Sequence, residues 1–247
     1  MSQPVSSRLI TNIEKVIVGK HDTVIRLVAA LLANGHVLLE DVPGTGKTIM
    51  ARSMAKSLDV SFRRIQFTPD LLPSDLTGTP IFNQKTTEFE FRPGPLFAGV
   101  VLADELNRAT PRTQSALLEA MEERTVTIDG VTRDLPAPFF VVATQNPVEQ
   151  QGVYDLPEAQ LDRFLVRLEL GYSAIADERR IVEAQRTEHP IQTLQSVIAV
   201  EDLTAEQQQL RDEVKGESNV AEYIVRLVAA TREHRDVALG ASPRASI

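Results

Sequence analysis

His36-Val-Leu-Leu-Glu40 leads directly into Asp41-Val-Pro-Gly-Thr-Gly-Lys-Thr48, and the residues from Thr48 to Leu58 then follow a helical pattern. A strand, a glycine-rich turn and a helix in this order form the start of an α/β unit. Backbone N–H groups in such a turn curl around phosphate oxygens. We therefore predict a loop that holds a triphosphate. The alternative is a chance Gly-Lys-Thr turn, and the flanking strand and helix argue against it.

The residue types in this loop match the chemistry of a triphosphate bound with Mg²⁺. Gly44 and Gly46 permit a tight turn, Lys47 supplies a cation for the β- and γ-phosphates, and Thr48 supplies a hydroxyl for the metal. Asp41 stands where the strict pattern has glycine, but aspartate tolerates unusual backbone angles better than most residues. The predicted phosphate-binding residues are Pro43, Gly44, Thr45, Gly46, Lys47 and Thr48.

Apolar runs alternate with helical patterns over the first two-thirds of the chain. The expected strands are His36–Glu40, Phe62–Phe67, Gly99–Ala103, Phe139–Ala143 and Leu165–Leu170. Most of them lack polar alternation, as strands buried on both faces of a parallel sheet do. Helical patterns cover Thr48–Leu58 and Thr113–Glu123. The fold class predicted from this order is α/β, with a parallel sheet covered on both faces.

Two segments interrupt the alternation and read as β-hairpins. Thr79–Phe91 alternates in part around a polar centre, and Arg124–Leu135 holds β-branched residues around Asp129-Gly130, a strong hairpin signal. Their charges are mixed. Lys85 and Arg133 are outweighed by Glu88, Glu90, Asp129 and Asp134.

Strand signals stop after about Gly171, and the last third of the chain is expected to be helical. Asn219–Arg232 has the pattern of an amphipathic helix, and Thr204 with Gln207 resembles a capping box that would begin the helix before it. We predict a nucleotide-binding core over residues 1–171 and a helical domain over residues 172–247.

A second chemical signal is Gly99-Val-Val-Leu-Ala-Asp104-Glu105, an apolar strand that ends in two carboxylates. Asp104 at the carboxyl end of the strand can order Mg²⁺, and Glu105 can act as general base on the attacking water. Acidic pairs often simply close a strand at the surface. The phosphate loop upstream favours the functional interpretation.

For three further polar residues, their order in the chain after the phosphate loop and the carboxylate pair favours a functional role. Asn146 follows the fourth expected strand, beside the first and third, and can orient a water between Glu105 and the γ-phosphate; the alternative is a plain Asn-Pro turn. Arg163 and Arg244 each lie near a helix boundary, where a lone arginine is usually just solvated. For Arg163 that alternative is a surface pair with Asp162 or Glu158.

Composition narrows the class of protein. The net charge is −8, which disfavours a nucleic-acid partner. The chain has no cysteine, as fits a reducing compartment, and its four histidines show no metal-ligand spacing. No signal-peptide pattern begins the chain, and the longest apolar stretch, Leu27–Ala33, is far shorter than the about 20 residues that span a bilayer. We expect a cytoplasmic protein.

Longer runs spread over nearly the whole chain add to these signals. They are Glu40-Asp-Val-Pro-Gly, Gln66-Phe-Thr-Pro-Asp-Leu-Leu-Pro-Ser-Asp, Phe91-Arg-Pro-Gly-Pro-Leu, Asp104-Glu-Leu-Asn-Arg-Ala, Ala116-Leu-Leu-Glu-Ala-Met-Glu-Glu, Ala143-Thr-Gln-Asn-Pro, Leu156-Pro-Glu-Ala-Gln-Leu-Asp-Arg-Phe and Gly240-Ala-Ser-Pro-Arg. Together these runs resemble the MoxR group of AAA+ ATPases, in which Asp41 in the phosphate loop is itself usual.

The resemblance implies a P-loop AAA+ three-layer core with a parallel five-stranded sheet and β-hairpin inserts, followed by a small all-α lid. Relatives continue past the Gly240–Arg244 run with further lid helices, so it also implies a lid that is incomplete at its C-terminus. The cofactors implied are ATP and Mg²⁺. The partners implied are a homo-hexameric ring, a von Willebrand A-domain protein and a protein client, often a metalloenzyme.

The resemblance also implies roles for single residues. Val18 and Gly19 would line the adenine pocket. Asp104 and Glu105 would be Walker B, with Asp104 and Thr48 at the metal, and Asn146 would be sensor 1. The arginines implied are Arg163 as the finger that reaches a neighbouring subunit, with Arg108 and Arg112 as competitors, and Arg244 as sensor 2.

Three other functions compete with Mg²⁺-dependent ATP hydrolysis coupled to the remodelling of a protein client. A nucleic-acid motor would share the hairpin inserts, but their charge balance argues against it. A magnesium-chelatase-like motor subunit is a nearer relative. A non-hydrolysing nucleotide switch conflicts with intact Lys47, Asp104 and Glu105.

Overall fold

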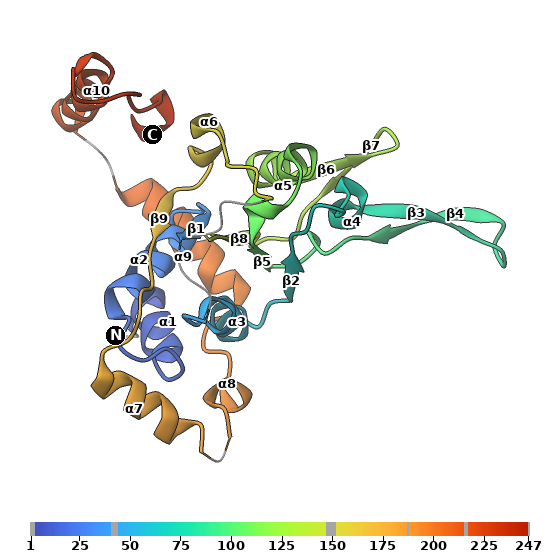
Figure 1. The fold of residues 1–247 in the computed structure, drawn as a ribbon, viewed down its shortest axis with the longest axis horizontal. Helices are drawn as coiled ribbons and strands as arrows, with labels where there is room; N and C mark the ends of the chain where they lie inside the picture. The colour runs from blue at the N-terminus through green and yellow to red at the C-terminus, as the bar shows by residue number, and fades with distance from the viewer. Residues whose placement is uncertain (1–2, 41–43, 147–151, 187, 215–216, 247) are drawn as a thin grey trace. The chain divides into compact units, whose positions relative to one another are not determined.

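A parallel sheet of five strands forms the centre of the computed structural model, which describes residues 3–40, 44–146, 152–186, 188–214 and 217–246 (Figure 1). The strand order is β2-β5-β8-β1-β9, so β2 and β9 are the edges. The strands are β1 (Val37–Glu40), β2 (Phe62–Gln66), β5 (Val100–Asp104), β8 (Phe140–Gln145) and β9 (Val166–Leu168). All five predicted strands are confirmed, with ends that shift by up to two residues.

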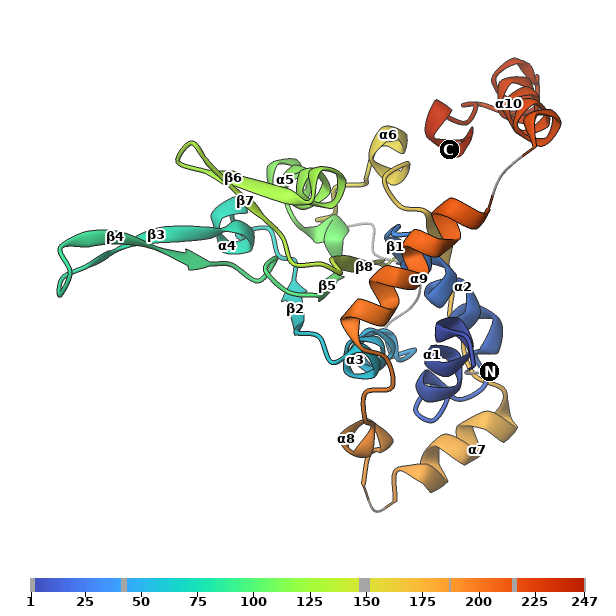
Figure 2. The same ribbon diagram turned by 180° about the vertical axis from the view of Figure 1, so that it is seen from behind.

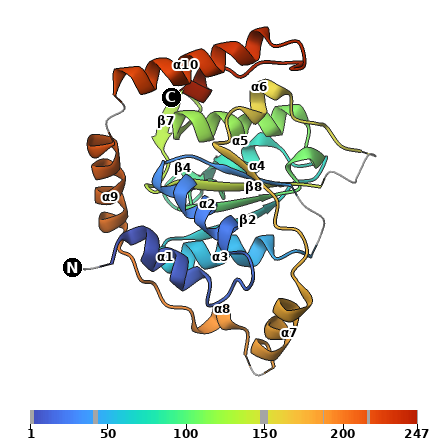
Figure 3. The same cartoon turned by 90° about the vertical axis from the view of Figure 1, so that its left-hand side faces the viewer.

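Each face of this sheet packs against its own apolar core, because successive side chains of a strand point to opposite faces. Val37, Leu39, Val100 and Leu102 join the core made with helices α1, α2 and α3, whereas Leu38 joins the core made with α5. Figure 3 shows α1 and α3 on one side of the sheet and α5 on the other. The predicted α/β sheet covered on both faces is thus confirmed. The helices bounding these cores are α1 (Val5–Ile13), α2 (His21–Leu32), α3 (Lys47–Leu58) and α5 (Pro111–Glu123).

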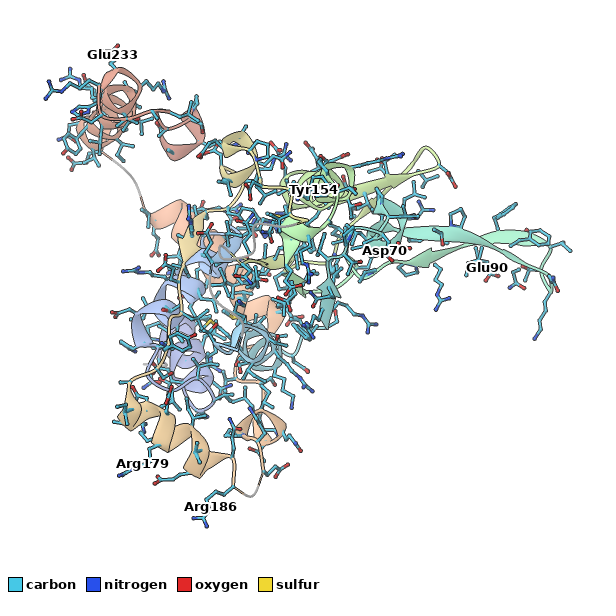
Figure 4. The ribbon with its side chains drawn as sticks, viewed as in Figure 1. Asp70, Glu90, Tyr154, Arg179, Arg186 and Glu233 are labelled. Carbon is cyan, nitrogen blue, oxygen red and sulfur yellow. The ribbon has the colours of Figure 1, made fainter. Side chains whose placement is uncertain are left out.

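Two antiparallel hairpins stand outside the central sheet and project in the same direction (Figures 1 and 2). The first pairs β3 (Gly78–Asn83) with β4 (Glu88–Pro93), and the second pairs β6 (Thr125–Ile128) with β7 (Val131–Asp134). Arg133 places its guanidinium 4.1 Å from the centre of the Phe91 ring, which joins the two hairpins through a cation–π contact. Both predicted hairpins are confirmed, and Glu90 lies on the outer part of the first (Figure 4).

Only helices follow β9 in the described part of the chain. Three short elements lie before β9: the helix α4 (Pro73–Thr77), the 3-10 turn η1 (Leu106–Arg108) directly after β5, and the helix α6 (Glu158–Leu161). After β9 come α7 (Ile175–Ala184), α8 (Pro190–Thr193), α9 (Val200–Glu213), α10 (Ser218–Glu233) and the 3-10 turn η2 (Pro243–Ser246). None of the helices in the described ranges combines the length and apolar character that crossing a membrane needs.

The chain groups into two compact units, Met1–Ala205 and Glu206–Ile247. The two units divide within α9, later than residue 171, where the nucleotide-binding core was predicted to end. The domain boundary after residue 171 stays a prediction. The prediction that Thr204 begins a capping box is wrong. Thr204 lies inside α9, where its hydroxyl donates to the Val200 carbonyl 2.9 Å away, so it does not cap the helix.

The second unit is built on α10, whose C-terminal end is held by the segment that follows. The Thr231 hydroxyl accepts from the Ala241 N–H at 2.9 Å, and Arg232 Nε donates to the Ala241 carbonyl at 2.9 Å. The predicted amphipathic helix is confirmed. Among its residues only Val228 is buried, while Tyr223 and Leu227 of the apolar face are 67% and 56% exposed.

Candidate functional site

The carboxyl ends of β1, β5 and β8 lie side by side at one end of the sheet, because the three strands are parallel and in register. Glu40 at the end of β1 pairs with Gln145 of β8, and Ala103 of β5 pairs with Ala143 of β8. On the outer side of β5, Gln66 of β2 pairs with Asp104. This register brings side chains from distant parts of the sequence to one place, as is usual for ligand sites in open α/β sheets.

A cavity of about 340 Å³ lies at the carboxyl ends of these strands. Its lining residues are Gly44, Gly46, Lys47, Thr48, Ile49, Arg64, Asp104, Glu105, Thr144, Gln145 and Asn146. Seven of the residues predicted from the sequence to form the site therefore line one cavity. Asn146 follows β8 between β5 and β1, beside the third and first strands as predicted.

The glycine-rich loop turns into helix α3 on one wall of the cavity. Gly44 and Gly46 have φ angles of 86° and 96°, a region that residues with a Cβ rarely adopt. A Cβ at either position would have no heavy atom within 4 Å, so the glycines serve the backbone conformation and not close packing. Lys47 and Thr48 begin α3, whose first turn carries no acidic residue. Exposed N–H groups at such a helix start favour an anion. Pro43, predicted to belong to this loop, lies outside the described residues.

Asp104 also lines the cavity, and its carboxylate is held by three donors. Its Oδ2 accepts from Arg64 Nε at 3.0 Å and from Arg64 Nη2 at 2.6 Å. Its Oδ1 accepts from the Thr144 hydroxyl at 2.7 Å. The side chain of Asp104 is only 12% exposed and that of Arg64 is 49% exposed. The buried carboxylate is thus neutralised by one arginine that reaches in from the edge strand.

Glu105 adopts a left-handed backbone conformation, with a φ of 57°, directly after β5. Its N–H donates to the Thr144 hydroxyl at 2.8 Å, so the same threonine also serves Asp104. Glu105 Oε2 accepts from Gln66 Nε2 at 2.6 Å and from Arg108 Nη1 at 2.9 Å. The turn directs the carboxylate along the cavity wall, where these two donors hold it.

The donor set at the cavity suits Mg²⁺. The Thr48 hydroxyl and the Asp104 carboxylate are hard oxygen ligands of the kind this ion prefers, and Mg²⁺ commonly takes few protein ligands and completes its shell with phosphate oxygens and waters. In the described ranges, no group of three or more histidine, cysteine, aspartate or glutamate side chains could hold a metal by itself. The residues therefore fit an ion that arrives with a nucleotide.

Val18 and Gly19, predicted at the adenine, do not line this cavity; they lie in the segment before α2. Gly19 has a φ of 74°, and a Cβ there would come within 2.3 Å of the Asp177 carboxylate on α7. The next residue, Lys20, donates through Nζ to the carbonyls of Leu170, Gly171 and Tyr172 at 2.6, 3.1 and 2.8 Å. This segment therefore contacts the chain just after β9.

The arginines predicted as finger or sensor are not among the residues that line this cavity. Arg163 forms an ion pair with Glu122 of α5 at 2.9 Å and donates to the Leu118 carbonyl at 2.8 Å, in a separate hollow of about 210 Å³. Its partner on α5 was not predicted from the sequence. Arg112 lies exposed in the first turn of α5, and Arg108 binds Glu105. Arg244 lies in η2 of the second unit.

The sequence did not reveal Arg64, Gln66 and Thr144 as parts of the site. Arg64 and Gln66 alternate along the exposed edge strand, so both side chains point to the same face, beside Asp104 and Glu105. The available signal was that Arg64 and Gln66 are polar residues two positions apart in a predicted strand, and so lie on one face of it. Its meaning depends on β2 being the neighbour of β5, which only the strand order supplies.

Comparisons with known proteins agree on one family. The model of the ATPase family associated with various cellular activities (AAA) matches residues 36–166. The uncharacterized protein YeaC of Bacillus subtilis is 57% identical over 99% of this chain and 76% of its own length. The chaperone MoxR1 of Mycobacterium tuberculosis is 44% identical over 97% of this chain, which spans 65% of MoxR1. A crystal structure of a candidate ATPase from Cytophaga hutchinsonii has a TM-score of 0.87 and 41% identity, covering 97% of this chain and 75% of that one.

Proposed function

Because the chain belongs to the MoxR family of AAA+ ATPases, we propose that it hydrolyses ATP with Mg²⁺ and uses the energy to remodel a protein client. The observation that carries this proposal is the single cavity that Lys47 and Thr48 line together with Asp104 and Glu105. Within this cavity a cation and a helix start suit phosphates, and two carboxylates suit a metal ion and a water.

Five side chains of the cavity each have one proposed task. Lys47 and the backbone N–H groups of the loop bind the β- and γ-phosphates, and Thr48 and Asp104 hold the metal. Bound Mg²⁺ would neutralise charge that develops on the phosphate oxygens. Glu105 accepts the proton of the attacking water, and Asn146 orients that water.

A Glu105→Gln variant tests the proposal because an amide cannot accept the proton while Asp104 and Lys47 stay in place. We expect nucleotide affinity within about twofold of the unaltered protein and phosphate release that is slower by about 10²–10⁴. Glu88→Gln, on the exposed hairpin strand β4, is the matched control and should leave phosphate release unchanged. A near-normal rate in Glu105→Gln would exclude Glu105 as the base.

We further propose a homo-hexameric ring in which Arg163 reaches the nucleotide of a neighbouring subunit. The placement of Arg163 supports a role in trans, because it pairs with Glu122 and does not line its own cavity. Val18, Gly19 and Pro43 at the nucleotide and Arg244 as sensor 2 belong to the same proposal. A von Willebrand A-domain protein is the proposed partner, and remodelling of the client agrees with the name of the chaperone MoxR1.

Mixing two inactive variants tests the trans arrangement. Arg163→Ala should lower turnover by about 10³ or more, the usual contribution of such a finger, while ATP affinity stays similar. The Lys47→Ala variant should not bind ATP, but it can still supply Arg163 to the nucleotide of a neighbouring subunit. The mixture should recover part of the activity, since each variant supplies what the other lacks. A mixture that stays inactive, with turnover per chain independent of protein concentration, would assign Arg163 to surface pairing and leave Arg108 and Arg112 as candidates.

A further inference from the structure

Arg64 is the one described cavity residue that binds the carboxylate proposed for the metal while belonging to neither strand β5 nor strand β8. It sits on the edge strand β2, and its guanidinium places two N–H donors on a single oxygen, Oδ2 of Asp104. An ionised carboxylate has about four acceptor positions. Arg64 fills two of them on Oδ2 and Thr144 fills one on Oδ1, so a single position stays open.

A divalent ion and the Arg64 guanidinium would repel each other if both bound the Asp104 carboxylate. The Asp104 side chain is 12% exposed, so water screens charges around it weakly. Two cations within a few ångström of one carboxylate repel each other, whether the ion binds Oδ2 or the open position on Oδ1. Arg64 is itself 49% exposed, so its long side chain has a direct route into solvent.

We propose that Arg64 is an internal counter-ion that holds Asp104 in the nucleotide-free protein and that the incoming metal displaces it. On this view Arg64 sets the affinity for the metal and is a positioning residue, not a catalytic one. The inference rests on the proposed function, since it assumes that Asp104 meets the metal that accompanies the nucleotide.

The same displacement reaches Glu105 through Gln66. Arg64 Nη2 also donates to Gln66 Oε1 at 2.8 Å, and Gln66 Nε2 donates to Glu105 Oε2 at 2.6 Å. When Arg64 leaves, the Gln66 amide loses the donor that fixes its orientation. Occupancy of the metal position is thereby coupled to the side chain proposed as the general base.

A different role for Arg64 predicts the opposite sign. If Arg64 stayed in place and oriented Asp104 for the metal, its removal would weaken metal binding. If Arg64 is displaced, its removal strengthens metal binding. The direction of the change therefore decides between the two.

The experiment is a titration of Mn²⁺, which shares the oxygen-ligand preference of Mg²⁺, into protein saturated with ADP, followed by electron paramagnetic resonance. We expect Arg64→Gln to bind Mn²⁺ about three- to tenfold more tightly than the unaltered protein, as suits the loss of a competing, partly exposed ion pair. Arg64→Lys, which keeps the charge but cannot place two donors on one oxygen, should fall between them.

Arg63→Gln is the matched control because it removes the same charge from the neighbouring position of β2, where the exposed side chain points to the other face. Its Mn²⁺ affinity should change by less than about twofold. Equal or weaker Mn²⁺ binding in Arg64→Gln overturns the inference; should that variant not fold, equal or weaker binding in Arg64→Lys does so. Failure of the unaltered protein to bind ADP would instead overturn the proposed function.

Discussion

The two ends of strand β1 use polar groups in opposite ways. At the amino end, His36 is 4% exposed; its Nε2–H donates to the Met121 carbonyl and its Nδ1 accepts from the Val141 N–H, both at 3.1 Å. At the carboxyl end, Lys47 and Thr48 line a cavity of about 340 Å³. One end of the strand is closed by internal partners, and the other is arranged around a space for a ligand. We therefore expect substitutions at the two ends to separate stability from nucleotide binding.

The largest effect is expected at the carboxyl end, for Lys47→Ala. The β- and γ-phosphates lose their main cation, so ATP affinity should fall by more than about 100-fold, measured with a fluorescent nucleotide. The thermal unfolding midpoint should change much less, because Lys47 lines the cavity and belongs to neither apolar core. Arg52→Ala, an exposed cation on the same helix, should retain normal affinity. Normal ATP binding by Lys47→Ala would remove the phosphate loop from the site.

At the amino end, the expected effect is on stability and depends on pH. Burial lowers the pKa of His36 to about 3, with the positive charge of Arg124 as the second cause and the Met121 carbonyl acting in the other direction. Below the ordinary value of about 6.5, the unfolded chain binds a proton that the folded protein does not. This contribution to stability is complete above pH 6.5 and is lost as the pH falls toward about 3.

Urea unfolding at pH 7 and pH 5 measures this loss. The unaltered protein should lose about 2 kcal/mol more stability between these pH values than His36→Gln, which has no imidazole to titrate. His234→Gln removes an exposed histidine and should keep the pH dependence of the unaltered protein. If His36→Gln shows the same dependence, the buried imidazole is not its source. ATP affinity at pH 7 should be similar in all three proteins.

A smaller effect at the carboxyl end separates backbone conformation from side-chain chemistry. Gly46→Ala forces a residue with a Cβ into a φ of 96°, so ATP affinity should fall by about tenfold as the loop relaxes to another conformation. Gly130→Ala, with a φ of 75° in the β6–β7 turn and equally open space, carries a similar strain away from the cavity. It should reduce thermal stability but leave ATP affinity unchanged. Equal affinities in the two variants would mean that the loop does not need its left-handed glycine.

The sequence predicted the sheet and the cavity well because both depend on local patterns. An apolar run such as Val100–Ala103 has no stable place except a buried strand, and a turn such as Asp129-Gly130 specifies a hairpin by itself. Asp104 and Asn146 could be placed together because parallel strands end at a common edge.

Features that depend on a partner distant in the sequence could not be predicted in this way. Arg163 meets Glu122 across 41 residues, and Arg64 meets Asp104 across 40, so neither pair leaves a local signal. The capping-box prediction at Thr204 was wrong for a different reason. The Thr-x-x-Gln spacing occurs inside helices as well as at their starts, and in α9 the hydroxyl binds the carbonyl four residues earlier.

The contact of Lys20 with the chain after β9 has a mechanical consequence. A tension applied to the chain beyond Tyr172 would otherwise act in series on the short strand β9, whose pairing with β1 covers three residues. Because Lys20 Nζ holds three successive carbonyls there, it offers a second, parallel path that leads into the start of α2. The load is then shared between an ammonium group and a β-ladder, so the shortest strand pairing of the sheet does not bear it alone.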